Sequence, residues 1–134
     1  MTEPFSSYLV RLVIALLIGG AVGLEREFRG KPAGMRTNML ICIGSCLIMI
    51  ISIEIARGAA RTADPGRIAA QVVTGIGFLG AGTIMKEGLS VRGLTTAASI
   101  WITAAIGVLI GIGFYFPALV ATGLTLGTLS VFRW

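Results

Sequence analysis

Five apolar stretches, each close to the length of a membrane-spanning helix, take up most of this chain of 134 residues. A helix needs about 20 mostly apolar residues to cross the hydrocarbon core of a bilayer. Only 13% of the residues are charged, whereas a soluble domain carries about 25%. The sequence therefore predicts an all-α fold, a polytopic integral membrane bundle with about five transmembrane helices, as a single domain over residues 1–134. The stretches cover residues 8–24, 39–56, 68–85, 94–112 and 114–132.

Basic residues gather in the short polar links and predict the orientation in the membrane. Only Glu3 is charged before residue 8, whereas four basic residues follow Leu24 within a dozen positions. Lys and Arg accumulate in cytoplasmic loops, so we expect the N-terminus outside and the C-terminus in the cytoplasm. On this topology the inner side holds Arg26, Arg29, Lys31, Arg36, Lys86, Arg92 and Arg133, and the outer side holds Arg11, Arg57, Arg61 and Arg67. The net charge of +5 then reflects contact with the lipid bilayer, and no basic soluble module is present that would bind nucleic acid.

Signatures of enzymes and of metal sites are absent from the sequence. The chain has no histidine, no nucleophile elbow, and only two cysteines, Cys42 and Cys46, both within an apolar stretch. Their i, i+4 spacing suits helix packing, whereas a disulfide along one helix would be distorted. We therefore expect no enzymatic activity, no cofactor and no metal site.

Glycines are concentrated in the third apolar stretch. The string from Gly75 to Gly82 matches the G-x-G-x-x-G pattern of dinucleotide sites, but it lacks the preceding strand that such a site requires. Two interpretations remain: a seam that another helix approaches closely, or an unwound segment that lines a cavity. Spaced glycines elsewhere are also typical of helix packing, and one such pair is a candidate oligomer interface. The packing glycines are Gly75, Gly77, Gly80 and Gly82, with the pairs Gly19/Gly23, Gly107/Gly111 and Gly123/Gly127.

Charged residues at the inner end of the first stretch are the first candidate functional group. The set is Glu25, Arg26, Arg29, Arg36 and Arg92. Charges near the hydrocarbon are costly unless they are paired or face water. Because Glu25 directly follows Leu24, we expect it to turn inward and pair with Arg36 or Arg92. Such a pair would be either a substrate gate or a structural clamp between helices.

The remaining candidates are Glu54, Gln71, Thr95 and Thr96. Glu54 lies near the outer end of the second stretch, one turn from Arg57, so a local ion pair is possible there. Gln71 lies near the outer end of the third stretch. Thr95 and Thr96 enter the fourth stretch, where they would either cap the helix start or help it bind an anion.

Four ordered segments of the chain resemble the MgtC/SapB family of bacterial inner-membrane proteins. They are residues 19–27, 34–37, 67–82 and 91–101. The resemblance implies a multi-pass domain in the inner membrane with an external N-terminus, linked to growth at low magnesium and to survival inside host cells. Many members carry a soluble C-terminal domain, which we do not expect in a sequence that ends at Arg133-Trp134.

Two hypotheses for function follow. In the first, the chain is a non-enzymatic regulator that binds other membrane proteins through its helix faces. In the second, it is a small channel or transporter, oligomeric in the membrane, with a polar route past Glu25, Gln71 and Thr95. A transporter needs a polar or hydrated path near the bilayer midplane. The polar residues of this sequence gather toward the ends of the stretches, which favours the regulator.

Overall fold

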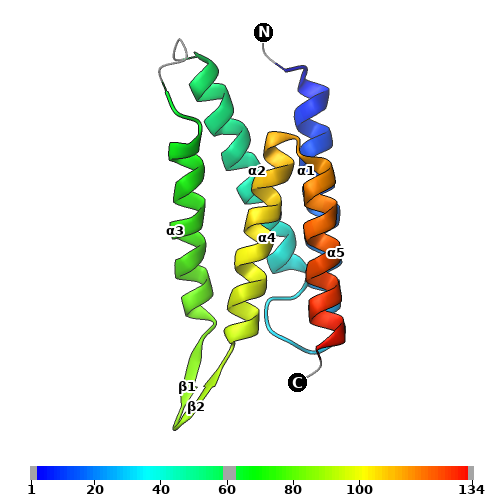
Figure 1. Ribbon diagram of the computed structural model, residues 1–134, viewed down its shortest axis with the longest axis vertical. Helices are drawn as coiled ribbons and strands as arrows, with labels where there is room; N and C mark the ends of the chain where they lie inside the picture. The colour runs from blue at the N-terminus through cyan, green and yellow to red at the C-terminus, as the bar shows by residue number, and fades with distance from the viewer. Residues whose placement is uncertain (1–2, 59–62, 133–134) are drawn as a thin grey trace.

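Five helices run roughly along the long axis of the molecule in the computed structural model, which describes residues 3–58 and 63–132 (Figure 1). The helices are α1 (Phe5–Phe28), α2 (Met35–Gly58), α3 (Gly66–Gly82), α4 (Leu94–Ile112) and α5 (Tyr115–Val131). The predicted all-helical fold is confirmed. By length and composition α1, α2 and α4 can each cross a membrane, and α5 is a shorter apolar helix. Arg61 and Arg133, which entered the charge count, lie outside the described residues.

The third helix is shorter than the sequence predicts. We expected it to continue to Met85, but α3 ends at Gly82, and Met85–Glu87 (β1) pairs with Ser90–Arg92 (β2) in an antiparallel hairpin. The turn needs Gly88, whose φ of 63° lies in the left-handed region. Glycine adopts this conformation without a steric penalty. The apolar pattern runs on through Ile84 and Met85, so hydropathy did not mark the end of the helix.

The core lies where α2 packs between α1 and α4. Its buried members are small or β-branched side chains of α1, α2, α4 and α5: Ala15, Ile18, Cys42, Cys46, Ile50, Ile106, Ile110 and Ala118. Both cysteines are free and fully buried, as the packing interpretation predicted. A second, smaller cluster, which includes Ile41, Val72 and Ile100, joins α3 to α2 and α4.

Two glycine pairs allow the helices of this core to approach closely. A Cβ atom on Gly19 would lie 2.6 Å from the Asn38 carbonyl oxygen, and one on Gly23 would lie 2.5 Å from the Met35 Cα. On α4, a Cβ atom on Gly111 would lie 2.6 Å from the Met49 Cβ, and Gly107 meets the backbone of Cys42 in the same way. Small residues spaced by four permit such backbone contacts between helices in lipid.

The glycines of α3 behave differently. A Cβ atom on Gly80 would meet Ala97 of α4 at an ordinary 3.6 Å, and Gly75, Gly77 and Gly82 have no atom of another described element within 4 Å. The alternative of an unwound segment is wrong, because α3 is a continuous helix from Gly66 to Gly82. No described helix of the same chain forms the predicted close seam at Gly75, Gly77 and Gly82. The cause is the position of α3, which lies at one side of the bundle, with Gly75, Gly77 and Gly82 exposed (Figure 1). Gly75 and Gly82, seven residues apart, lie on one side of α3 and are called the α3 glycine face below, whereas Gly77 lies on another side of the helix.

Candidate functional site

Charged and aromatic side chains meet at the end of the bundle where α1 begins and α2 ends. The hydroxyl of Tyr8 donates to Glu54 Oε1 at 2.6 Å, and Arg57 Nη1 donates to the same oxygen at 2.7 Å. The predicted pair of Glu54 and Arg57 is thus present. Arg11 is 8% exposed, donates from Nη1 to the Gly111 carbonyl at 2.9 Å, and lies 3.6 Å from the carboxylate of Glu3. Every carboxylate of this outer cluster is thereby engaged by a cation or a hydroxyl.

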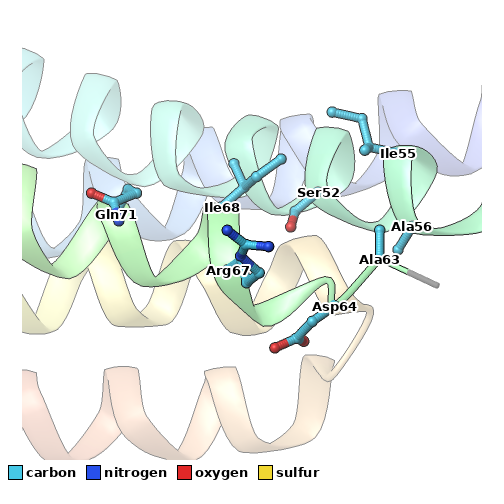
Figure 2. Close-up of a pocket in the computed structure, with 8 residues that line it drawn as sticks. All are labelled: Ser52, Ile55, Ala56, Ala63, Asp64, Arg67, Ile68 and Gln71. Carbon is cyan, nitrogen blue, oxygen red and sulfur yellow. The ribbon is translucent and has the colours of Figure 1, made fainter. Parts of the chain in front are cut away.

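Gln71 does not join that cluster. It lines a separate cavity of about 420 Å³ between the end of α2 and the start of α3, together with Ser52, Asp64 and Arg67 (Figure 2). The Ser52 hydroxyl donates to the Pro65 carbonyl, and Asp64 Oδ1 accepts from the Gly66 backbone N–H at 2.8 Å. Ser52 and Asp64 therefore fix the turn into α3, and Gln71 is an exposed side chain beyond it.

At the opposite end of the bundle, Arg26 is the most buried charged residue described. It is 4% exposed, and its Nη2 donates to the hydroxyl oxygen of Thr96 on α4 at 2.7 Å. Its Nε is buried without an acceptor among the described residues. None of the ion pairs found among those residues includes Arg26. A buried cation without a counter-charge is unfavourable.

Glu25 has a different partner from the one we expected. Its carboxylate forms an ion pair with Arg29 one turn along α1, although the two groups are not aligned as a hydrogen bond. Arg92 lies 3.6 Å from Glu87 across the hairpin, and Arg36 is exposed. The predicted pairing of Glu25 with Arg36 or Arg92 is wrong, because Arg29 at i+4 on the same helix face is nearer than Arg36 of α2 or Arg92 of β2.

A cavity of about 810 Å³ opens beside Arg26, and it is called the inner cavity below, after the side of the membrane that the charge pattern predicts for it. It brings together five of the nine polar candidates: Arg26, Arg29, Arg92, Thr95 and Thr96. Lys31 lines it as well, so four cationic side chains face one space, and no acidic side chain is among its described lining residues. Charges of one sign around a recessed space reinforce one another and attract counter-ions. The inner cavity is electropositive.

The two threonines at the start of α4 are not helix caps. The helix begins after Gly93, whose φ is 88°, and no side chain caps its first turn. Thr96 accepts the bond from Arg26, and Thr95 is exposed in the inner cavity. The first N–H groups of a helix have no partner within the helix, so this terminus carries uncapped donors. The capping interpretation is wrong.

A buried hydrogen-bond group that sequence reasoning missed joins α2 to α4. Asn38 is fully buried, and its Nδ2 donates to the Ala33 and Gly34 carbonyls at 2.6 and 3.0 Å. The Thr103 hydroxyl lies within donor distance of Asn38 Oδ1, at 3.0 Å, and of the Ser99 carbonyl, at 2.8 Å. These bonds hold the turn that carries Lys31 against α4. In the sequence, Asn38 stands just before the apolar stretch 39–56, so its side chain is easily assigned to a loop.

An apolar bundle with charged side chains gathered at its two ends defines a polytopic integral membrane protein. The chain belongs to the MgtC family, whose sequence profile matches residues 12–134. A protein of Escherichia coli K12 named putative magnesium transporter YhiD is 47% identical over 132 residues, which is 96% of this chain and 61% of that protein. The protein MgtC of Salmonella typhimurium LT2 is 49% identical over 115 residues, 86% of this chain and 48% of that protein.

A third relative, the protein MgtC of Brucella abortus, is 47% identical over 120 residues, 90% of this chain and 49% of that protein. The chain thus spans between about half and three fifths of the length of these relatives. No solved structure matches. The family and the apolar helices identify a membrane protein.

Proposed function

We propose that the chain is a non-enzymatic regulator that binds other membrane proteins through its helix faces and does not itself carry magnesium. In this proposal the link to magnesium is indirect, because the chain alters the activity of proteins that move ions. The observation that carries the proposal is the apolar core, which lies between the outer cluster and the inner cavity.

The polar residues of the transporter hypothesis do not line one route within the chain. Glu25 and Thr95 lie at the end with the inner cavity, and Gln71 lies near the other end in the cavity of Figure 2. Mg²⁺ is held through carboxylates in near-octahedral geometry. Glu25 and Glu54 are instead paired with arginines, and four cations around the inner cavity repel a divalent cation.

The α3 glycine face is the surface that best suits a partner helix. Gly75 and Gly82 leave the α3 backbone exposed on one side, and Phe78, one turn from each of them, is 81% exposed. In lipid, association relies on close packing of backbones, for which glycine leaves room. A helix of another membrane protein, or α3 of a second copy in a homo-oligomer, would fit this face.

Photo-crosslinking in membranes tests this proposal. A photoreactive residue at Phe78, beside the glycine face, should give a discrete crosslinked product with a membrane protein. The second substitution Gly75→Leu should abolish that product without lowering the folded yield, because no described atom occupies the space around Gly75. Gly44→Leu on α2 is the matched control, since it also has open space around it. Crosslinks that persist in Gly75→Leu, or only diffuse lipid adducts, would refute a partner at α3.

The second candidate function, a magnesium transporter, rests on the name of one relative. It requires a conducting path made by several copies, because a buried apolar cluster lies between the two ends of one chain. Transport of Mg²⁺ by the purified chain would decide between the two functions.

A further inference from the structure

The inner cavity contains a buried arginine that forms no ion pair among the described residues. Arg26 is 4% exposed, and its only side-chain hydrogen bond within the described residues goes to the neutral Thr96 hydroxyl. Its Nε lines up with no acceptor in the described part of the chain. Burying such a cation without a counter-charge is strongly unfavourable. An anion at this cavity wall would offset that cost.

The other cations of the inner cavity surround the same space. Lys31 has no ion-pair partner among the described residues. Arg29 is held by Glu25 and donates from Nη2 to the Ser130 carbonyl at 3.2 Å, so it is largely occupied. Arg92 is 75% exposed and only 3.6 Å from Glu87, an exposed pair that an anion can replace at little cost. Arg26, Lys31 and Arg92 are therefore the available cations.

The start of α4 supplies a second kind of donor. The helix begins beside Arg26 without a side-chain cap, and Gly93, Leu94, Thr95 and Thr96 all line the inner cavity. The partial positive charge of a helix N-terminus and its unpaired N–H groups bind anions. The 19-residue length of α4 provides an extended dipole. Thr95 adds an exposed hydroxyl.

We propose that the inner cavity binds a phosphate group, with Arg26 as its buried anchor and the α4 N-terminus and Lys31 completing the site. Arginine forms paired hydrogen bonds with phosphate oxygens. A phosphate presents more acceptor oxygens than a carboxylate and can use this many donors at once. The cavity of about 810 Å³ is also lined by Leu94, Leu129 and Phe132, so it has room for an ester rather than a bare ion. The phosphate belongs either to an anionic lipid headgroup or to a soluble compound.

Binding to the purified full chain in a neutral detergent tests the proposal. The probes are inorganic phosphate, ATP and phosphatidylglycerol, each titrated at physiological salt, with phosphatidylcholine as the reference lipid. Saturable binding raises the thermal unfolding midpoint, since a ligand that binds only the folded state stabilises it. Saturation by phosphatidylglycerol alone assigns the site to a lipid headgroup, and saturation by phosphate or ATP assigns it to a soluble compound.

Variants separate the inner cavity from general attraction to a basic surface. Lys31→Gln combined with Arg92→Gln should weaken binding about tenfold or more, since charged hydrogen bonds are lost. Both side chains are exposed, so folding should be unaffected. Arg36→Gln removes an exposed charge at the same end but outside the cavity, and should change the affinity less than about twofold. Arg26→Gln should abolish binding if it folds. No saturable binding of any probe, or equal losses in Arg36→Gln and the double variant, would overturn the proposal.

Discussion

Gly93 is a residue whose side chain is excluded for two separate reasons. Its φ of 88° is left-handed, and a Cβ atom would overlap the carbonyl oxygen of Thr83. Gly88 in the same hairpin shares the left-handed φ, at 63°, but has open space around it. A side chain at Gly88 would cause backbone strain alone, whereas a side chain at Gly93 would cause the same strain and the overlap with Thr83. The hairpin and the α4 N-terminus both depend on Gly93.

We predict that Gly93→Ala lowers the stability of the folded chain much more than Gly88→Ala. The left-handed conformation costs a residue with a Cβ atom about 1–2 kcal/mol at either position, and only Gly93 adds the overlap. Thermal unfolding in detergent, followed by helical circular dichroism, measures the difference. Equal midpoints for the two variants would contradict the geometry of the turn.

At this scale the sequence predicted short-range pairs better than long-range ones. The spacing of Glu54 and Arg57 on one helix face was enough to anticipate their contact. For Glu25, the i+4 neighbour Arg29 offered the same kind of contact. We expected Arg36 or Arg92 instead, because Glu25 directly follows the apolar stretch and was expected to turn toward another helix. The bond of Arg26 to Thr96 joins α1 to α4, and such a contact depends on tertiary packing that no spacing in one sequence reveals.

Among the helices, α2 owes its central place to glycines on its two neighbours. Gly19 of α1 and Gly111 of α4 each lie in close contact with α2, at different positions along that helix. The five helices could be anticipated from hydropathy, because a membrane helix is apolar both where it packs on other helices and where it contacts lipid. The sequence could not predict which glycines form contacts, because the same spacing of glycines occurs on packed and on open helix faces. Gly75, Gly77 and Gly82 of α3, part of the richest glycine pattern in the sequence, are left open, and so is the predicted pair Gly123/Gly127 on α5.

We predict that Gly19→Ala destabilises the bundle and that Gly77→Ala does not. The added methyl group at Gly19 would lie 2.6 Å from the backbone oxygen of Asn38, which cannot rotate away. Overpacking of this kind costs about 1–3 kcal/mol. Folded yield and the unfolding midpoint in detergent report the cost. A loss of stability in Gly77→Ala as large as that in Gly19→Ala would show that Gly77 is packed even in the single chain.

For the molecule as a whole, the charge pattern predicts which end faces the cytoplasm. The helices run along one axis, α1 starts at one end and α5 finishes at the other (Figure 1). The inner cavity, with four cations, lies at the end where α5 finishes. On the positive-inside rule that end is cytoplasmic.

Reporter fusions check this orientation. A reporter that is active only in the periplasm should be inactive when fused after residue 134 and active when inserted in the link 57–67. A cytoplasm-active reporter at the same two sites should give the reciprocal result. Activity of the periplasmic reporter at residue 134, with none at 57–67, would invert the topology and place the inner cavity outside.

The central claim is that this membrane bundle does not itself move magnesium. The purified chain is reconstituted into liposomes that contain a magnesium-sensitive dye, and an ionophore added at the end confirms that the dye responds. The apolar core between the two charged ends and the cations around the inner cavity predict an influx equal to that of empty liposomes. Saturable influx above that level, lost in Glu25→Gln, would contradict the account and identify the chain as a transporter.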